Sequence, residues 1–234
     1  MKRDYAKQHI QIWNKVWEQD KYASPEIRKQ KAEKKVKLLF EMLPIEINKD
    51  SLILDAGCGG GYVSEYLLAH TEARIIAFDQ SESALNICNR IDENHRIETV
   101  CCDALEIPFE NECADLAVCI GLLEHVREYD RCIEEIKRIL KKDGFFYVVS
   151  SNKYSSMYFQ WIVRHIFHLW KYGYQKNWTP RQLAEIMKKH SFRQIDIKVI
   201  EGWGDHSSLS FIDRIIRKKS KNFGRYIVYL GQKK

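Results

Sequence analysis

The sequence predicts an α/β protein with a doubly wound, mostly parallel sheet of seven strands, the last of them antiparallel. Apolar runs of strand length alternate with helical patterns between residues 52 and 150. An acid or a glycine follows four successive runs, and two further apolar runs lie at 192–200 and 225–230. Strands that alternate with helices at this spacing indicate a parallel sheet covered by helices on both faces.

Two helices are expected before the sheet. The first is expected at 5–19, where His9, Trp13 and Trp17 recur every four residues, as on one face of an amphipathic helix. Such an aromatic stripe serves either as core packing or as a lid over a bound ligand.

The second helix is expected to start at Ser24, its N-cap, and to end at Pro44. Pro25 and Glu26 suit the first helical turn, because proline has no N–H to leave unpaired there and an acid favours the positive helix end. The apolar face of this helix lies opposite a basic face, which consists of Arg28, Lys29, Lys31, Lys34, Lys35 and Lys37.

Five strands and three helices are expected in the central part of the chain, residues 50–150. The strands are expected at 52–54, 73–78, 96–101, 114–120 and 145–150. The helices between them are expected at 62–69, at 81–91 with Ser81 as N-cap, and at 129–142 with Gly144 beyond the last turn.

An insert rich in aromatic residues interrupts the alternation from 151 to 178. Connections in α/β domains are usually short, so this insert indicates a lid or a substrate-binding segment. Trp13, Tyr154, Tyr158 and Trp161 are expected to line a substrate pocket. The chain, 1–234, would then be one domain, with a helical cap at 1–44, the core at 50–150, the insert, and the rest of the sheet at 179–234.

Composition predicts a soluble, globular chain. Its 234 residues are 45% hydrophobic and 30% charged, and the polar N-terminus does not resemble a signal peptide, which favours a cytoplasmic protein. The seven cysteines form no C-x-x-C pair, so buried reduced thiols are expected rather than disulfides or a metal site. A net charge of +6 is compatible with phosphate, nucleic acid or an anionic membrane surface as a partner.

The strongest local signal lies between Leu52 and Gly61. An apolar run ends at Asp55 and is followed by glycines at 57, 59, 60 and 61, before a helical pattern begins at Tyr62. A strand, a tight glycine turn and a helix N-terminus let an anionic group approach the backbone closely. The dinucleotide pattern G-x-G-x-x-G would need a glycine at position 62, so Tyr62 disfavours a dehydrogenase.

Polar residues or glycine also follow the next three expected strands. Asp79 and Asp103 follow the second and third strands, and Ile120 with Gly121 ends the fourth. In a doubly wound sheet, ligands bind at the carboxyl edge where the strand order reverses. A carboxylate at position 79 can accept hydrogen bonds from two ribose hydroxyls, and one at 103 can accept from an exocyclic amine. A nucleoside-binding site is therefore predicted at this edge.

Five stretches together carry a family resemblance: Asp55-x-Gly57-x-Gly59-x-Gly61, Phe78-Asp79-x-Ser81, Cys102-Asp103-Ala104, Asp115-Leu116-Ala117-Val118 and Leu123-Glu124-His125-Val126. They resemble the class I S-adenosylmethionine (SAM)-dependent methyltransferases, in particular those of ubiquinone and menaquinone biosynthesis. The resemblance covers about residues 50–150 and implies a Rossmann-like fold, SAM as cofactor and S-adenosylhomocysteine as product. It implies no metal ion.

The resemblance also implies which residues contact SAM. Asp79 would hold the ribose, Asp103 the adenine, and Ile120 would lie near the sulfonium. The full implied set runs in chain order from the glycine loop to the fourth strand: Asp55, Gly57, Cys58, Gly59, Gly61, Asp79, Gln80, Asp103, Ala104 and Ile120.

The implied reaction transfers a methyl group to a hydroxyl or amine of a small or medium-sized acceptor, such as a natural product, a quinone-like compound or a sugar. A hydroxyl acceptor must lose its proton, and a base assists that step. His125, directly after the fourth strand, is expected to be this base, although it could instead belong only to the start of the next helix. The sequence does not rank four other histidines, which are His9, His165, His168 and His206.

Two other functions are compatible with the sequence. The basic faces at 28–37 and 214–221, with interleaved aromatic residues, suit an RNA-binding protein or an RNA methyltransferase, whose affinity would fall steeply with salt. The segment 157–170 suits a transient contact with a membrane surface. A small-molecule acceptor is the expected partner, nucleic acid is less expected, and the chain is expected to be a monomer or a homodimer.

Overall fold

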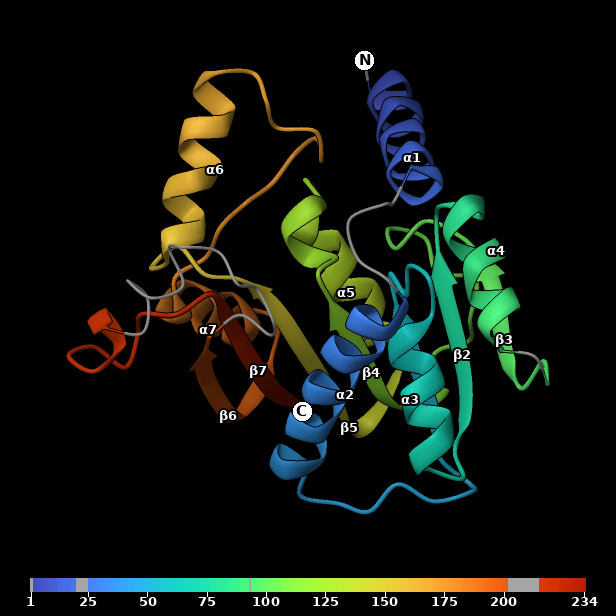
Figure 1. Ribbon diagram of the computed structural model, residues 1–234. Helices are drawn as coiled ribbons and strands as arrows, with labels where there is room; N and C mark the ends of the chain where they lie inside the picture. The colour runs from blue at the N-terminus through green and yellow to red at the C-terminus, as the bar shows by residue number, and fades with distance from the viewer. Residues whose placement is uncertain (1, 20–24, 93, 202–214) are drawn as a thin grey trace.

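One sheet organises the protein, which is described here by a computed structural model of residues 2–19, 25–92, 94–201 and 215–234. Its strands are β1 Leu52–Ala56, β2 Arg74–Asp79, β3 Ile97–Cys101, β4 Ala114–Ile120, β5 Leu140–Ser151, β6 Phe192–Ile200 and β7 Tyr226–Lys233. Their order is β3-β2-β1-β4-β5-β7-β6 (Figure 1). The first five strands pair in parallel, and β7 is antiparallel to both β5 and β6. The predicted mostly parallel, seven-stranded sheet with an antiparallel last strand is confirmed.

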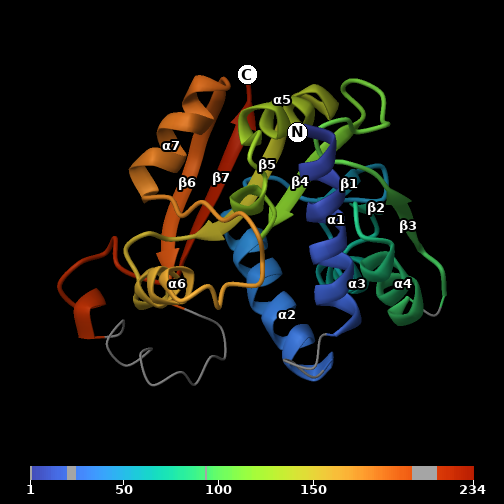
Figure 2. The same ribbon diagram turned by 90° about the horizontal axis from the view of Figure 1, so that it is seen from above.

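Helices cover both faces of the sheet. They are α1 Lys2–Glu18, α2 Pro25–Met42, α3 Tyr62–His70, α4 Glu82–Ile91, α5 Tyr129–Ile139, α6 Ser156–Ile166 and α7 Pro180–Lys189, with a short 3-10 helix, η1, at Leu123–His125. Figure 2 shows α2, α3 and α4 on one face of the sheet and α5 and α7 on the other. Helix α1 packs against α4 and lies over the edge where the parallel strands end. The expected N-cap of α2, Ser24, lies outside the described residues.

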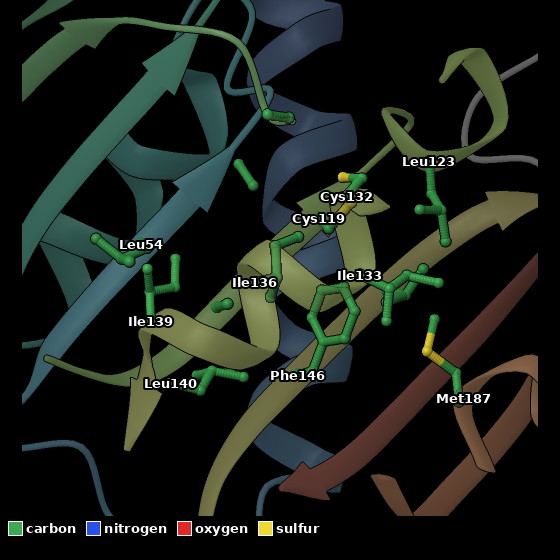
Figure 3. Packing of buried hydrophobic residues seen from close by; sticks show 14 of the residues in the cluster. Leu54, Cys119, Leu123, Cys132, Ile133, Ile136, Ile139, Leu140, Phe146 and Met187 are labelled. Atoms are coloured by element: carbon green, nitrogen blue, oxygen red, sulfur yellow. The ribbon is translucent and has the colours of Figure 1, made fainter. Parts of the chain in front are cut away.

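Two apolar layers hold the helices to the sheet. On the face of α2 and α3, Val36, Leu39 and Leu67 pack against strand residues such as Ile53 and Ile75. Full burial of side chains of this size contributes about 1.5–3 kcal/mol each. Figure 3 shows part of the opposite layer, under α5 and α7, which includes Leu54, Cys119, Leu123, Cys132, Ile133, Ile136, Ile139, Leu140, Phe146 and Met187.

The cysteines do not all share one environment, although all seven are free thiols. Cys88, Cys119 and Cys132 are buried in the apolar layers, as expected. Cys101 is exposed, so the expectation of a buried thiol is wrong at this position. The physical reason is that β3 is an edge strand, which has a neighbouring strand on one side only.

The helix expected at 129–142 is shorter than predicted. It ends at Ile139, because Leu140 already pairs with Ala114 and the amide of Cys113 donates to the Ile139 carbonyl at 2.9 Å. Residues 140–142 therefore belong to β5, although helix propensity alone would place them in the last turn of the helix. Gly144 belongs to β5 and is not a helix cap.

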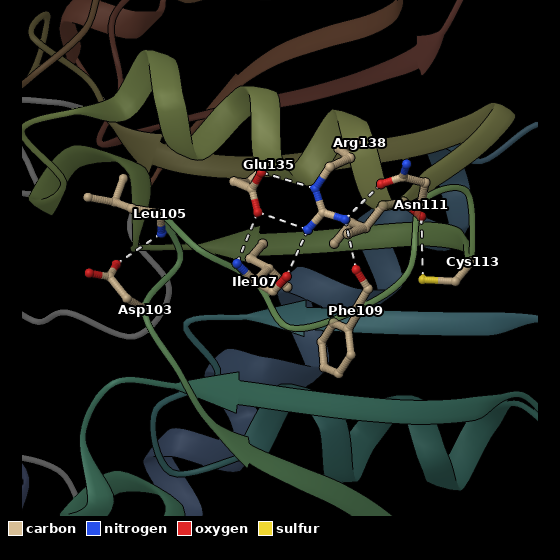
Figure 4. Close-up of polar contacts among 9 residues, drawn as sticks. Asp103, Leu105, Ile107, Phe109, Asn111, Cys113, Glu135 and Arg138 are labelled. Carbon is tan, nitrogen blue, oxygen red and sulfur yellow. Dashed lines mark hydrogen bonds and ion pairs between the residues drawn. The ribbon is translucent and has the colours of Figure 1, made fainter.

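Arg138 fastens the connection between β3 and β4, which contains no helix (Figure 4). Its guanidinium donates to the carbonyl oxygens of Ile107 and Phe109 at 2.7 Å each. Glu135 accepts two further bonds from this guanidinium, at 3.0 and 2.9 Å, and one from the amide of Ile107 at 3.0 Å. The network attaches the connection to α5 and so fixes where Asp103 leaves the end of β3.

Gly61 and Gly121 form a matched pair for a stability test, because both have a φ of +76°. This backbone conformation costs other residues roughly 1–2 kcal/mol. A Cβ at Gly61 would overlap the sulfur of Cys88, whereas a Cβ at Gly121 would meet no atom within 4 Å. We expect Gly61→Ala to lower the free energy of unfolding by about 1–3 kcal/mol more than Gly121→Ala, since overpacking adds to the strain. Denaturant unfolding measures both variants, and equal losses would contradict this prediction.

Candidate functional site

A cavity of about 660 Å³ lies at the carboxyl edge of the parallel strands, between that edge and helices α1 and α2. Strand β1 lies between β2 and β4, so the strand order reverses at this point, as at the ligand sites of doubly wound sheets. The volume is within the range of small-molecule sites. The cavity is lined by the glycine loop, by residues that follow β2, β3 and β4, and by side chains of α1 and α2.

The glycine loop, residues 57–61, is attached to the end of the neighbouring strand β2. The amides of Gly57 and Cys58 donate to the carbonyl oxygen of Phe78 at 2.8 and 3.0 Å. The amide of Gly59 donates to Oδ2 of Asp79 at 2.9 Å. These bonds hold the loop so that residues 57–60 border the cavity.

Packing within the protein explains much of the glycine pattern. A Cβ at Gly59 would overlap the ring of Trp17 from α1, and a Cβ at Gly61 would overlap Cys88 of α4. Gly61 does not border the cavity. Gly121, at the end of β4, is different, because it borders the cavity and its side-chain position is open.

Two carboxylates lie at the ends of β1 and β2, where Asp55 is buried and Asp79 is partly buried. Asp79 borders the cavity and accepts from the amides of Gly59 and Ser81, each at 2.9 Å. Burial raises the Asp79 pKa, these backbone bonds oppose the rise, and each oxygen has a second lone pair for a ligand. Asp55 accepts from Ser64 Oγ at 2.7 Å behind the loop and does not border the cavity. Burial raises the Asp55 pKa to about 6.

Four other predicted cofactor residues border the cavity, namely Gln80, Asp103, Ala104 and Ile120. Oδ1 of Asp103 accepts from the amide of Leu105 at 2.9 Å, which orients the carboxylate at the end of β3. The structure therefore brings the predicted residues to one cavity, except Asp55 and Gly61, which support the loop from behind. Their contacts with SAM stay a prediction.

Helix α1 covers the cavity with His9, Trp13 and Trp17. Nε1 of Trp13 donates to Nε2 of His9 at 3.1 Å, and the side-chain amide group of Gln80 lies 2.8 Å from Nδ1 of His9, which carries the proton in this tautomer. An indole N–H only donates, so Nε2 of His9 supplies a lone pair and the ring is neutral. Burial and then the neighbouring His125 lower the His9 pKa, which agrees with a neutral ring. His9 thus links α1 to the end of β2.

His125 lies in η1 and borders the cavity. Its Nδ1 lies 2.9 Å from the carbonyl oxygen of Tyr174, which can only accept, so Nδ1 carries the proton. In the neutral ring, Nε2 then has the lone pair. Trp13 packs edge-on against the ring, at 4.9 Å between centroids. The tautomer and orientation that a base needs are therefore both fixed.

Sequence reasoning missed three cations of the site. Arg28, Lys31 and Lys35 belong to the predicted basic face of α2, yet they border the cavity. Their spacing of three and four residues beside the buried Ala32 and Val36 is the signal that could have identified them.

The aromatic residues of the insert do not border the cavity as expected. Tyr154, Tyr158 and Trp161 lie at or in α6 and are not among the lining residues. Figure 1 shows α6 apart from α1, on the side of β5 and β7. The reason is that Asn152 anchors the start of the insert there, since its Nδ2 donates to the carbonyl oxygen of Gly224 at 2.7 Å.

The insert reaches the site through residues 172–176 instead. Tyr174 supplies the carbonyl that orients His125. The amide of Lys176 donates to the Glu124 carbonyl at 2.7 Å, and the ring of Tyr172 lies 6.2 Å from that of Trp13.

Helix α6 and the residues after it expose a large apolar surface. Phe159, Ile166, Phe167 and Leu169 are each about two-thirds exposed. No helix in the described part of the chain is long and apolar enough to cross a membrane. Contact of this surface with a membrane stays a prediction.

The sheet order, the glycine loop and the strand-end acids together define the architecture of a class I methyltransferase. Residues 54–148 match a family model described as a methyltransferase domain. A solved SAM-dependent methyltransferase from Thermotoga maritima has the same fold, with a TM-score of 0.69, 17% identity, and coverage of 96% of this chain and 99% of that one. Residues 54–148 thus form a methyltransferase domain, and the chain is similar in fold to a SAM-dependent methyltransferase.

Two curated relatives are similar to this chain in sequence. An uncharacterised protein of Methanocaldococcus jannaschii is 38% identical over 121 residues, which is 50% of each chain. The ubiquinone biosynthesis O-methyltransferase of Coxiella burnetii is 29% identical over 156 residues, which is 64% of this chain and 66% of that protein. The chain thus spans between half and two-thirds of the length of these relatives.

Asp55 provides a test of the buried electrostatics. Its pKa rises from 3.8 to about 6 on folding, so the folded protein binds more protons than the unfolded chain in that window. Stability is therefore lost as the pH rises through it, by about 3 kcal/mol in total. We expect Asp55→Asn, which cannot ionise, to gain stability relative to wild type between about pH 4 and pH 7. Denaturant midpoints across this range measure the gain, with the exposed Asp50→Asn as control. A difference that stays constant with pH would contradict the prediction.

Proposed function

We propose that this chain transfers the methyl group of SAM to a hydroxyl or amine of a small or medium-sized organic acceptor. The observation that carries this proposal is the cavity, which gathers the glycine loop, Asp79, Asp103 and His125 at one sheet edge. Bound SAM supplies an activated sulfonium methyl group. The protein contributes by orienting SAM and the acceptor and by excluding water, which together lower the barrier by roughly 7–11 kcal/mol.

The charge and the open space at this edge support the binding of SAM. The open side of Gly121 and the backbone of the glycine loop leave room for the methionine part. Asp79 accepts from the ribose hydroxyls with its remaining lone pairs, and Asp103 accepts from the adenine amine. Trp13 and Trp17 of α1 cover the bound cofactor and keep water away from it.

His125 is the base in this proposal. Its Nε2 takes the proton of an acceptor hydroxyl, and its Nδ1–H keeps the bond to the Tyr174 carbonyl. That bond becomes charge-assisted once the ring is protonated, and it stabilises the imidazolium. The name of the Coxiella burnetii relative, an O-methyltransferase, supports an oxygen acceptor.

A role in RNA binding has less support than a small-molecule acceptor. Arg28, Lys31 and Lys35 line the cavity, so the basic face of α2 is divided. On its outer side, Lys29 pairs with Glu65 at 2.7 Å and Lys37 with Glu33 at 2.6 Å. These acids offset charge that would otherwise attract a phosphate backbone.

Asp79 tests cofactor binding. We expect wild type to bind both SAM and S-adenosylhomocysteine, and Asp79→Ala to bind them at least about 100-fold more weakly, because two charge-assisted hydrogen bonds are lost. Titration calorimetry measures both, with the exposed Asp50→Ala as control. Asp79→Asn keeps the shape of the side chain and one acceptor oxygen, so it separates loss of charge from disorder of the loop. No binding to wild type would overturn the proposed function.

His125 tests the chemical step. We expect His125→Gln to lower kcat by roughly 10²–10⁴-fold for a phenolic acceptor found by screening phenols with radiolabelled SAM, since the base is lost. Affinity for S-adenosylhomocysteine should stay the same. The acid limb of the wild-type pH–rate profile should disappear in the variant. The exposed His165→Gln serves as control, and unchanged turnover in His125→Gln would exclude the base role.

A further inference from the structure

Helix α2 divides its basic residues between two environments. Arg28, Lys31 and Lys35 are partly buried and border the cavity. Lys34, on the same helix, is exposed to solvent. Positions i, i+3 and i+7 lie on one helix face, so three cations face a single cavity from one rigid element.

Arg28 lies beside the glycine loop. Its Cζ is 4.8 Å from the ring centroid of Trp17 and 5.6 Å from that of Tyr62. Trp17 in turn packs against Gly59. SAM has one carboxylate, on its methionine part, and Arg28 would hold it if the glycine loop binds that part as proposed. Arg28 is therefore assigned to the cofactor, which leaves Lys31 and Lys35 for another ligand.

Lys31 and Lys35 lie one and two helical turns further along α2. Burial lowers the Lys31 pKa, and the charged groups that lower it further, Arg225 and then Arg28, are both cations. Burial also lowers the Lys35 pKa, to about 8, and Lys31 adds to this effect while Glu124 and Asp55 oppose it. The hydroxyl of Tyr147 donates to the Lys35 carbonyl at 2.9 Å, so β5 holds this turn of the helix in place.

Acidic and basic residues border different parts of the cavity, apart from Arg127 and Glu128, which lie side by side after η1. The acids Asp79 and Asp103 lie at the ends of β2 and β3, where the nucleoside is proposed to bind. Cations line the side of α2. Like charges held close together in a partly desolvated cavity are costly, and an anionic ligand group between them offsets that cost.

We propose that Lys31 and Lys35 form an anion-binding subsite for the methyl acceptor, which therefore carries a phosphate or carboxylate group. This inference rests on the proposed function, because it assigns the subsite to the acceptor of the same reaction. The subsite holds the anionic end of the acceptor on α2, and the hydroxyl or amine points toward His125. Two lysines of one helix face suit a phosphate or diphosphate as well as a carboxylate, since ammonium groups bind as point charges.

The test measures binding of inorganic pyrophosphate, and separately of benzoate, to the protein saturated with S-adenosylhomocysteine. We expect wild type to bind at least one of them. The anion that binds more tightly shows whether the subsite prefers a phosphate or a carboxylate group. Lys31→Met and Lys35→Met should each weaken this binding by about 10- to 100-fold, because a charge-assisted hydrogen bond is lost. Lys31→Arg and Lys35→Arg should retain most of it.

Controls separate this inference from the proposed function and from a purely structural role. Lys34→Met removes a charge from the outer face of the same helix and should leave pyrophosphate and benzoate binding unchanged. Affinity for S-adenosylhomocysteine should stay within about threefold of wild type in the Lys31 and Lys35 variants. If S-adenosylhomocysteine binds but neither anion does, the subsite is excluded and the proposed function stands. If Lys31→Met and Lys35→Met change thermal stability but not anion binding, the two lysines have only a structural role and the subsite is excluded. If wild type does not bind S-adenosylhomocysteine, both proposals are excluded.

Discussion

The attachment of the glycine loop to the end of β2 is the interaction on which the site depends. The carbonyl of Phe78 accepts from Gly57 and Cys58, and the carboxylate of Asp79 accepts from Gly59. These bonds join the carboxyl ends of two parallel strands, so the loop is fixed by the sheet and not by its own sequence. The same carboxylate is available to a ligand, because each of its oxygens has a further lone pair. One partly buried acid, Asp79, therefore supports the loop and borders the cavity.

The cover of the cavity is built from elements distant in sequence. Helix α1 contributes the indole rings of Trp13 and Trp17, helix α2 contributes cations, and residues 172–176 of the insert orient His125. Each of these elements is held by contacts with the sheet edge or with its loops. The His9 bond to Gln80 ties α1 to the end of β2, and the Lys176 bond to Glu124 ties the insert to the end of β4. The sheet edge thus determines both the floor of the site and the position of its cover.

Local sequence patterns predicted the structure correctly where interactions between neighbouring residues determine it. The strand-end acids were predicted correctly because parallel strands must end at one edge, and Asp79 and Asp103 do border one cavity. The end of α5 was predicted wrongly, because Leu140 pairs with Ala114 of β4. The residues around Leu140 contain no pattern that indicates pairing with a distant strand. The insert was expected to contribute Tyr154, Tyr158 and Trp161 to the pocket, yet it contacts the lining residues His125 and Trp13 with a different segment, residues 172–176. Aromatic composition does not determine which way a long insert folds.

By itself, the sequence determined the fold class, the mostly parallel sheet with its antiparallel last strand, and the positions of the acids at the strand ends. These depend on periodicity and on residues that directly follow a strand, which are local properties of the chain. Only the tertiary structure decided which cations of α2 face the cavity and which tautomer of His125 is present. The first depends on how α2 is rotated against the sheet, and the second on a carbonyl 49 residues away. Neither relation can be derived from neighbouring residues, because both arise from packing between elements far apart in the chain.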